Sequence, residues 1–450
     1  MSKSRFRRFD VFISRNADET KIPSVTAVLI ENGKPVHSTA HGFKDISSSS
    51  PASIKTLYGA GSITKSFTAL SIAKLAERGK LDFHDKITRF LPLKQKAFRE
   101  VELHHLLSHS SGIPGLGFSE VLIYNAIGTY KRRIPVSNFD DVAPFLDEID
   151  DWVESRPGEK LFYLNEGYHL LGDVVSKVSG RPYVQYVTEE ILKPLKMDRS
   201  YFEKGQIESD GDRSTPYIIK DGIATPSKIP HGCGPAGGLV TNIVDLSNYI
   251  AMLINGGEFE GQRIVSFDTL SRMETPYVNW PKPMFQGQGY GYGLEILPSF
   301  LGHKVILHGG SVEVFTASFA YSRTARCGVA ALANGTGYSM DRIVLYGLAL
   351  IMGENPDELP VIKLDTLLKR LEGTYSSYKG TVLAEVKRNG SFLMLSGEDI
   401  GENIVLVPET QDSDGATFFT LSGTARMTVE FRFIRNSVEM IYERYKYRKT

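Results

Sequence analysis

The pattern of residues changes near Gly353–Pro360, and this change constrains the fold of the 450-residue chain more than any other feature. The stretch Gly-Glu-Asn-Pro-Asp-Glu-Leu-Pro has the composition of a linker. Helix-like and strand-like patterns mix before it, whereas short alternating segments follow it. Because a single core stops growing in chains of this length, we predict two domains, residues 1–355 and 365–450.

The C-terminal domain is predicted to consist of β-strands. Every second residue of Met427–Phe433 is apolar, which is the pattern of a strand with one buried face. Asn389-Gly390 indicates a hairpin turn, and further turns are expected at Asp412–Gly415 and Ser422-Gly423. About 85 residues of this kind suit a small antiparallel barrel or sandwich.

The N-terminal domain is predicted to have an α+β fold. Residues 24–43 read as a hairpin around Asn32-Gly33, and helical patterns dominate from Ser62 to about Val187. Strand patterns return at Val305–Leu307 and Val329–Leu332. Strands near both ends with helices between them predict one antiparallel sheet flanked by helices, in which the two ends pair.

Charge and cysteine content exclude several classes of protein. The chain has 52 basic and 52 acidic residues, so no overall field attracts nucleic acid or an anionic membrane. No run of residues approaches the length of a membrane span, and the basic start Met1–Arg8 lacks the apolar segment of a secretory signal. Cys233 and Cys327 form no Cys-x-x-Cys pair. We therefore expect a cytoplasmic protein without nucleic-acid or membrane partners.

A Ser-x-x-Lys motif occurs three times, at Ser62–Lys65, Ser71–Lys74 and Ser376–Lys379. Ser62 follows a glycine turn and opens an apolar run that stops at Gly79, so it marks the start of a helix. The free N–H groups there favour negative charge. Ser71 lies inside the same helix, and Ser376 lies in the strand-rich tail.

Serine and lysine at this spacing share one helix face. A lysine with a lowered pKa can take the proton of the serine hydroxyl, which is the chemistry of an acyl-enzyme hydrolase. Ser62 is thus the candidate nucleophile and Lys65 its candidate base; the alternative is that Ser62 is only an N-cap. No Gly-x-Ser-x-Gly elbow surrounds Ser62, which argues against an α/β-hydrolase.

Two further stretches bear on the site, Tyr163-Leu164-Asn165 and His308-Gly309-Gly310-Ser311. Taken singly, they read as core packing with an N-cap and as a turn after a strand. His104, His105 and His109 could be read as a metal cluster, but no acidic residue has the spacing of His-Glu-x-x-His. We therefore expect neither a metal nor another cofactor.

These stretches in this order resemble the serine β-lactamase and penicillin-binding-protein superfamily over about residues 20–350. The branch of class C β-lactamases, D-alanyl-D-alanine carboxypeptidases, D-aminopeptidases and their esterase-like relatives is the most similar. Three further stretches agree in kind and order: Leu103–Gly112, Pro194–Met197 and Pro235–Leu239. The tail resembles the lipocalin-like barrels that are attached to some of these hydrolases.

The resemblance implies a role for each motif residue. Ser62 would be the nucleophile, with Lys65 and Tyr163 as a shared proton relay in which the neighbouring ammonium lowers the pKa of the phenol. Asn165 would hold Lys65 and orient a substrate amide. The remaining roles are an oxyanion hole from the backbone N–H groups of Ser62 and Ser311, and room for the substrate backbone along the strand edge at Gly309 and Gly310.

The third stretch departs from the Lys-Thr-Gly that β-lactamases and penicillin-binding proteins usually carry. His308 is mostly neutral at pH 7, so it provides little charge for a substrate carboxylate. We expect His308 to face the substrate from the edge strand as part of the catalytic site and to offer one hydrogen bond. Substrates would then be neutral near the scissile bond, as for aminopeptidase- or esterase-like members.

The sequence therefore predicts a serine peptidase or amidase that hydrolyses short peptides and accepts D-residues. A carboxylesterase with the same chemistry is the nearest alternative. A sensor that is acylated at Ser62 without turnover, or an idle scaffold whose tail binds a ligand, represents a different class. The C-terminal domain would narrow access to the site or join copies of the chain into a homo-oligomer.

Overall fold

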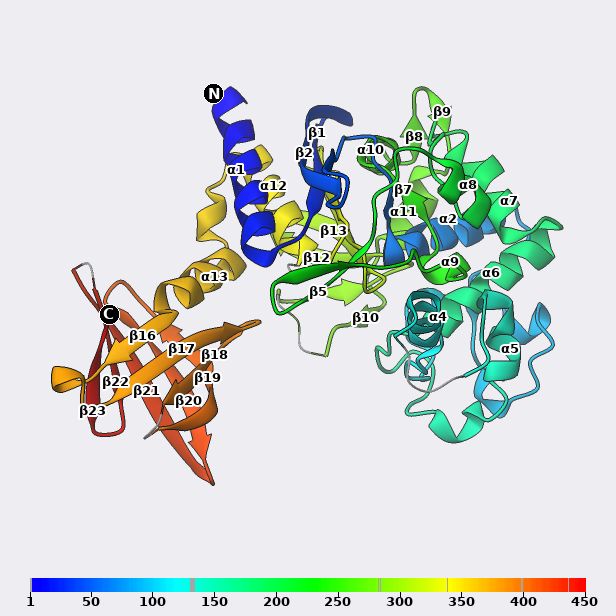
Figure 1. The fold of residues 1–450 in the computed structure, drawn as a ribbon. Helices are drawn as coiled ribbons and strands as arrows, with labels where there is room; N and C mark the ends of the chain where they lie inside the picture. Colours follow the sequence, from blue (N-terminus) through cyan, green and yellow to red (C-terminus); the bar gives the residue numbers. More distant parts are fainter. Residues whose placement is uncertain are drawn as a thin grey trace. The chain divides into compact units, whose positions relative to one another are not determined.

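The computed structural model describes residues 2–129, 134–281, 283, 285–337, 339–397, 400–435 and 437–450 (Figure 1). The chain divides into two compact units, Met1–Glu354 and Asn355–Thr450. The division falls inside the stretch where the sequence pattern changes. The two units are described separately below.

The first unit is built on a nine-stranded sheet in the described part of the chain, with the order β10-β11-β12-β13-β14-β15-β1-β2-β3. Its strands are β1 (Ser24–Glu31), β2 (Lys34–Asp45), β3 (Ser50–Pro51), β10 (Val278–Asn279), β11 (Gly289–Tyr290), β12 (Glu295–Phe300), β13 (His303–Ser311), β14 (Thr316–Ser322) and β15 (Cys327–Ala333). Neighbouring strands are antiparallel, and β1 pairs with β15. The predicted α+β fold, with its two ends joined in one antiparallel sheet, is confirmed.

The first hairpin shows how local sequence sets this topology. Asn32 and Gly33 between β1 and β2 both have positive φ angles, 51° and 71°. Two such residues in a row make the tight turn whose twist matches a two-stranded ribbon, and Asn-Gly is the dipeptide that adopts it most readily. The hairpin therefore forms where the sequence predicts it.

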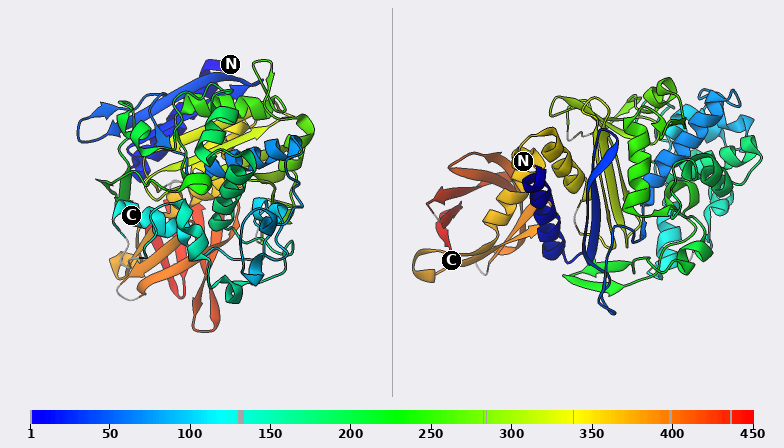
Figure 2. Two further views of the ribbon diagram at one scale, coloured as in Figure 1. Left: turned by 90° about the vertical axis from the view of Figure 1, so that its right-hand side faces the viewer. Right: turned by 90° about the horizontal axis from the view of Figure 1, so that it is seen from above.

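Helices cover both faces of the sheet, as the view from above in Figure 2 shows. On one face lie α1 (Ser2–Thr20) and α12 (Met340–Met352), which contact each other, and α12 packs on β14 and β15. On the other face α10 (Ile243–Ile254) packs on β1, β14 and β15. The sheet is thus buried on both sides.

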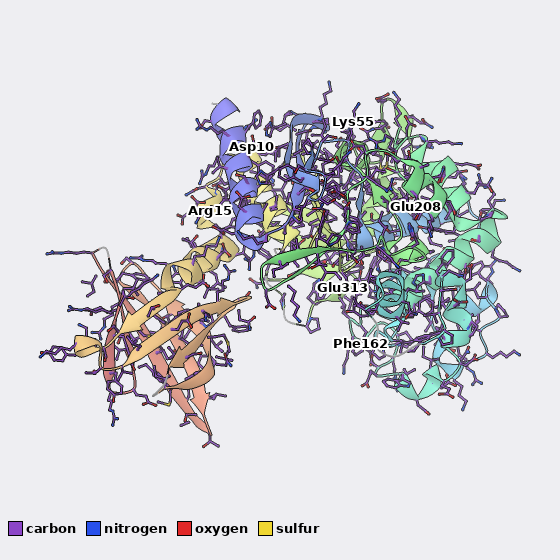
Figure 3. The ribbon with its side chains drawn as sticks, viewed as in Figure 1. Asp10, Arg15, Lys55, Phe162, Glu208 and Glu313 are labelled. Atoms are coloured by element: carbon purple, nitrogen blue, oxygen red, sulfur yellow. The ribbon has the colours of Figure 1, made fainter. Side chains whose placement is uncertain are left out.

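Helix α1 was not expected from the sequence, where the start of the chain was read only as basic. It buries Phe9, Ile13 and Ala17, which recur every four residues and so share one face. Asp10 on another face lies 2.7 Å from Nε2 of His37 on β2 (Figure 3). A helix with so many charged residues is recognisable only when the sheet that receives its apolar stripe is known.

Helix α2 (Thr64–Glu77) is buried along most of its length, from Thr64 to Leu75. It contacts α6 (Asn165–Ser179), α9 (Gly234–Gly237) and α11 (Phe267–Met273). A short 3₁₀ turn, Gly61–Ile63, leads into it. The start of α2 is therefore fixed from all sides, and Ser62 lies in that fixed turn.

Smaller elements complete the first unit. The helices are α3 (Leu103–Leu107), α4 (Phe118–Ile127), α5 (Val142–Phe145), α7 (Tyr183–Val187) and α8 (Lys204–Ser209). The short strand pairs are β4 (Tyr58–Gly59) with β7 (Val240–Thr241), β5 (Tyr217–Lys220) with β6 (Ile223–Pro226), and β8 (Glu258–Phe259) with β9 (Gln262–Arg263). Most of these elements lie between β3 and β10, where helical patterns were predicted.

The second unit is a closed antiparallel barrel preceded by a helix, α13 (Pro360–Leu371). The barrel strands are β16 (Gly373–Ser376), β17 (Leu383–Asn389), β18 (Phe392–Gly397), β19 (Gly401–Gln411), β20 (Gly415–Ser422), β21 (Ala425–Ile434), β22 (Ser437–Tyr442) and β23 (Tyr445–Lys449). Val429 and Phe431 are fully buried, as the alternation in β21 predicts. The predicted C-terminal β-barrel is confirmed.

The start of this unit differs from the expectation of a linker followed by strands from residue 365. Pro356–Glu358 form a 3₁₀ turn, and Pro360 begins α13. Proline is favoured in the first turn of a helix because its missing N–H would have no partner there. Leu367, Leu368 and Leu371 bury the apolar face of α13 against the barrel core.

No helix among the described residues is long and apolar enough to cross a membrane.

The two units are expected to fold independently. The apolar core around α2 is formed by residues between Val28 and Leu332, so a chain that ends at Glu354 keeps it whole. We expect this shortened chain to show one cooperative thermal transition and a helical circular dichroism spectrum. Loss of cooperative unfolding would contradict the division into separate cores.

Candidate active site

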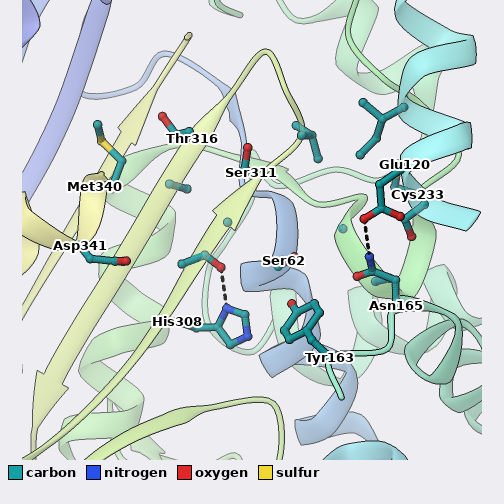
Figure 4. A pocket seen from close by; sticks show the side chains of 18 of the residues that line it. Ser62, Glu120, Tyr163, Asn165, Cys233, His308, Ser311, Thr316, Met340 and Asp341 are labelled. Carbon is teal, nitrogen blue, oxygen red and sulfur yellow. Dashed lines mark hydrogen bonds between the residues drawn. The ribbon is translucent and has the colours of Figure 1, made fainter. Parts of the chain in front are cut away.

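The predicted site residues surround one cavity of about 430 Å³ in the first unit (Figure 4). Those that line it are Ser62, Tyr163, Asn165, His308, Gly309, Gly310 and Ser311. Lys65 is fully buried directly behind Ser62. Three stretches that lie far apart in the sequence therefore meet, because η1, the start of α6 and the end of β13 converge on this cavity.

Ser62 and Lys65 are in direct contact. Nζ of Lys65 donates to Oγ of Ser62 at 3.1 Å and to the carbonyl oxygen of Ala236 at 2.7 Å. Burial lowers the pKa of Lys65 to about 7, although the carboxyl groups of Glu120 and Glu166 act in the opposite direction. A substantial fraction of this amine is neutral near pH 7 and can accept the proton of Ser62.

The other two Ser-x-x-Lys pairs have no such setting. Ser71 is buried inside α2 and donates to the carbonyl of Phe67 at 2.8 Å, while Lys74 donates to that of Ile264 at 2.6 Å. Ser376 lies on β16 of the barrel unit and donates to a neighbouring backbone carbonyl. Of the three serines, Ser62 is the one that opens onto the cavity described above.

Tyr163 lies against both groups. Its ring centroid is 4.9 Å from Nζ of Lys65, and the side chain of Ser62 acts to lower the pKa of its phenol. Burial raises the pKa of Tyr163 well above its usual value. The expectation that the ammonium of Lys65 lowers this pKa is therefore corrected: the phenol stays neutral, and Lys65 is the group that loses its proton near neutrality.

His109 supports Tyr163 from behind. It adopts a left-handed backbone conformation (φ 56°), and its Nδ1 accepts the backbone N–H of Leu164 at 3.0 Å. Its buried ring lies 4.1 Å from that of Tyr163 between centroids. His104 and His105, which were considered with it as possible metal ligands, bind Tyr292 and the backbone of Glu102 instead. The support of Tyr163 by His109 was not predicted from the sequence.

His308 has both ring nitrogens engaged by the protein. Nδ1 donates to the carbonyl of Gly309 at 2.6 Å, so Nε2 carries no proton and accepts from the hydroxyl of Tyr290 at 2.8 Å. Burial lowers the pKa of His308 to about 3, which keeps the ring neutral as expected. The expectation that a ring nitrogen faces the substrate is corrected, because neither nitrogen is left for it.

The strand that carries His308 lies inside the sheet, not at its edge as expected. β12 pairs with β13 only as far as Leu307, however, whereas β14 pairs with it from Ile306 to Ser311. Residues 308–311 therefore have a strand neighbour on one side only, and they line the cavity. A local edge exists although the strand as a whole is internal.

The paired glycines serve close packing within the protein. A Cβ atom on Gly310 would lie 2.0 Å from the carbonyl oxygen of Ala60, and one on Gly309 would lie 3.3 Å from Oδ1 of Asp341. The expectation that both leave room for a substrate is thus corrected for Gly310. Its missing side chain lets β13 approach the turn that holds Ser62.

This close approach also brings two backbone N–H groups together. The amide nitrogen of Ser62 lies beside Gly310, and that of Ser311 lies beside Gly61, within about 3 Å of where Cβ atoms would stand. These are the two donors that were expected to form an oxyanion hole. The two N–H groups can lie close together only because neither Gly61 nor Gly310 carries a side chain.

Asn165 occupies the opposite wall. Its Nδ2 donates to Oε1 of Glu120 at 3.3 Å, as the dashed line in Figure 4 shows. We expected Asn165 to contact Lys65. Instead, Lys65 donates to the carbonyl of Ala236, which belongs to the Pro235–Leu239 stretch. That stretch was noted in the sequence without a role.

Three carboxyl groups of the cavity were missed by sequence reasoning: Glu120, Glu295 and Asp341. They come from α4, β12 and α12, and no spacing or motif connects them. Burial raises the pKa of Glu295 to about 7, and the nearby Asp341 adds to this rise.

Comparison with known proteins gives two family matches. A family model described as Beta-lactamase matches residues 9–351, and one described as Pab87 octamerisation domain matches residues 356–448. The resemblance of the tail to lipocalin-like barrels stays a prediction.

Solved structures agree with the first match. The octameric penicillin-binding protein homologue from Pyrococcus abyssi is 40% identical, with a TM-score of 0.92 over 98% of this chain and 99% of that one. A D-stereospecific amidohydrolase from Streptomyces sp. is 21% identical, with a TM-score of 0.63 over 79% of this chain and 98% of that one, and so shares the fold.

Among curated proteins, protein flp from Staphylococcus aureus (strain MW2) is 28% identical over 255 residues, 55% of this chain and 49% of that protein. The chain thus spans about half the length of the curated relatives that it matches first.

The rate of acylation at Ser62 should rise with pH through about 7. The protonated ammonium of Lys65 cannot accept a proton, so the active form appears as the pH passes the lowered pKa and reaches a plateau above it. This pH dependence is measured from labelling rates with a fluorophosphonate between pH 5 and 9, about two pH units on either side of the pKa of Lys65. A profile that falls over this range would contradict Lys65 as the base.

Gly310→Ala should reduce acylation by about a hundredfold, because the clash with Ala60 displaces β13 from Ser62 and a shift of about 1 Å can have this effect. The strain should also destabilise the fold by about 1–3 kcal/mol. Gly205→Ala on α8, where an added Cβ would meet no atom within 4 Å, is the matched control. It should leave acylation unchanged and should not destabilise the fold, because alanine favours a helix more than glycine does. Equal behaviour of the two variants would show that the close approach is dispensable.

Proposed function

Because this chain belongs to the beta-lactamase family, we propose that it is a serine hydrolase that cleaves amide bonds of short peptides through an acyl-enzyme on Ser62. One observation carries the proposal: the hydroxyl of Ser62 faces a cavity and binds a buried lysine whose pKa is lowered to about 7. A serine that serves only as a helix cap needs no such partner.

The first step is the attack of Ser62 on the substrate carbonyl. Lys65 in its neutral form takes the proton of the hydroxyl, and the neutral phenol of Tyr163, whose ring lies against Lys65, helps to pass it on. The Oγ–carbon bond forms as the carbonyl oxygen becomes an anion. The N–H groups of Ser62 and Ser311 then stabilise that anion.

Collapse of this intermediate completes the acylation. The carbon–nitrogen bond breaks, the proton held by Lys65 and Tyr163 goes to the leaving amine, and the acyl group stays on Ser62. Water then attacks the ester carbonyl, giving its proton to the same pair. Ser62 regains the proton as the acid leaves, so the enzyme returns to its starting state.

The proposed substrates are short peptides and amides that include D-residues. Residues 308–311 lie beside the nucleophile and pair with a strand on one side only. An extended substrate backbone could pair with their other side. Acceptance of D-residues rests on the resemblance of the site motifs to the branch with D-aminopeptidases, and the solved amidohydrolase shares the fold. Esters remain possible substrates of the same steps.

The barrel unit is proposed to join copies of the chain. The family model over residues 356–448 is described as an octamerisation domain, and the Pyrococcus abyssi homologue is octameric. Both matches cover the second unit. Sedimentation of the full chain should therefore give a multiple of the mass of one chain, and a chain ending at Glu354 should give a smaller particle.

The test of the proposed function is covalent labelling combined with turnover. A fluorophosphonate should attach one covalent label to the wild type at Ser62 and none to Ser62→Ala, as measured by mass spectrometry. The wild type should also release the amine from D- or L-aminoacyl anilides. Ser71→Ala, which changes the buried serine of the second motif, is the control and should still be labelled. Undiminished labelling of Ser62→Ala would refute the assignment.

A further inference from the structure

The cavity beside Ser62 has an acidic lining. Glu120, Glu295 and Asp341 contribute carboxyl groups, and none of the described residues that line it is lysine or arginine. Lys65 lies behind the wall and is fully buried, with a lowered pKa. Such a lining repels a substrate carboxylate and attracts a cation.

Asp341 holds a fixed position over the strand that borders the nucleophile. It lies in the first turn of α12, and its Oδ1 accepts from Oγ of Ser318 at 2.7 Å. A Cβ atom on Gly309 would be 3.3 Å from Oδ1 and 3.8 Å from Oδ2. The absence of a side chain at Gly309 therefore leaves this carboxylate facing the cavity, on the left in Figure 4.

Glu295 lies on the same side of the cavity. It pairs across β12 and β13 with Leu307, the residue before His308, and accepts from Nε2 of Gln288 at 3.4 Å. Asp341 raises its pKa, and Glu295 in turn raises that of Tyr163. Glu295 is thus within electrostatic reach of both Asp341 and the phenol beside Ser62.

The spacing fits an amino group on the acyl residue of the substrate. Gly309 and the N–H of Ser311 are two residues apart on a strand, or about 7 Å. When the scissile carbonyl oxygen of the substrate binds that N–H, the α-amino nitrogen of the same substrate residue is about 3 Å from this oxygen. A hydrogen bond from the amino group to a carboxylate adds about 3 Å, so the amino group can reach the carboxylate beside Gly309. A longer side-chain ammonium such as that of lysine would extend beyond the carboxylate.

We propose that Asp341 and Glu295 bind the free α-amino group of the substrate's N-terminal residue, so that the enzyme removes N-terminal residues. The inference rests on the proposed function, since it places the scissile carbonyl at Ser62. An ammonium between these two partly buried carboxylates relieves their mutual repulsion and gains charge-assisted hydrogen bonds. Glu120, which accepts from Asn165, lies on the opposite wall of the cavity from Asp341 (Figure 4).

The first test compares wild-type kcat/KM for alanyl anilide with a free amine and for its N-acetyl form, in both D and L series. The free amine should be preferred by about tenfold or more, because the neutral analogue offers these carboxylates no charged partner. The preference should fall above about pH 8, where the α-amino group of the substrate loses its proton. This comparison needs no variant and therefore does not depend on folding of one.

The second test uses Asp341→Asn and Glu295→Gln, which keep the shape of each side chain and an oxygen acceptor for Ser318 or Gln288. Each should lower the ratio of kcat/KM for the free amine to kcat/KM for the N-acetyl substrate by about tenfold. The ratio is the readout because Glu295 also acts on the pKa of Tyr163, which affects both substrates alike. Asp268→Asn, an exposed carboxylate on α11, controls for the change of net charge and should alter neither value.

Two results would overturn the proposal in distinguishable ways. If wild type hydrolyses the N-acetyl anilide as fast as the free amine, and the variants leave that ratio unchanged, the amino-group site is wrong while the serine hydrolase stands. If neither anilide is hydrolysed and a fluorophosphonate fails to label Ser62, the proposed function fails and the inference fails with it.

Discussion

The burial of one lysine amine organises the first unit. Lys65 can keep a pKa near 7 only where water is excluded, and this requires α2 to be covered on every side. The carbonyl of Ala236 and the hydroxyl of Ser62 receive its hydrogen bonds, while the rings of Tyr163 and Tyr168 lie within 4.9 and 5.6 Å of it. On a surface helix this amine would stay protonated near neutrality. Here the surrounding helices exclude water and keep part of it in the neutral form that can accept a proton.

The second requirement is close contact between the helical layer and the sheet. Ser62 belongs to a helix start, whereas its partner donor, Ser311, belongs to β13, so the two must be brought within one hydrogen-bonding site. Gly61 and Gly310 permit this because side chains at either position would collide with the other segment. His308 secures the same strand by bonding to Tyr290 and to its own neighbouring carbonyl. The cavity is therefore defined by backbone contacts, and its lining side chains are free to differ in charge.

Much of the fold was predictable from local patterns. The hairpin at Asn32-Gly33, the helix after Ser62 and the alternation in Met427–Phe433 each follow from a short-range rule, and the structure bears them out. α1 and α13 were missed, because their charged residues hide apolar stripes that only a receiving surface makes recognisable. The meeting of Ser62, Tyr163 and His308 was predicted from a resemblance, since no periodicity connects residues so far apart.

The sequence by itself determined the residue types of the site, the start of α2 just after Ser62 and the separation into a mixed unit and a barrel unit, because these depend on neighbours along the chain. Only the tertiary structure decided protonation and charge. Burial lowers the pKa of Lys65, raises that of Tyr163 and keeps His308 neutral with both nitrogens occupied. The fold also brings Glu295 on β12 near Asp341 on α12. Desolvation and through-space charge depend on what surrounds a side chain in three dimensions, and no local pattern in the chain encodes that surrounding.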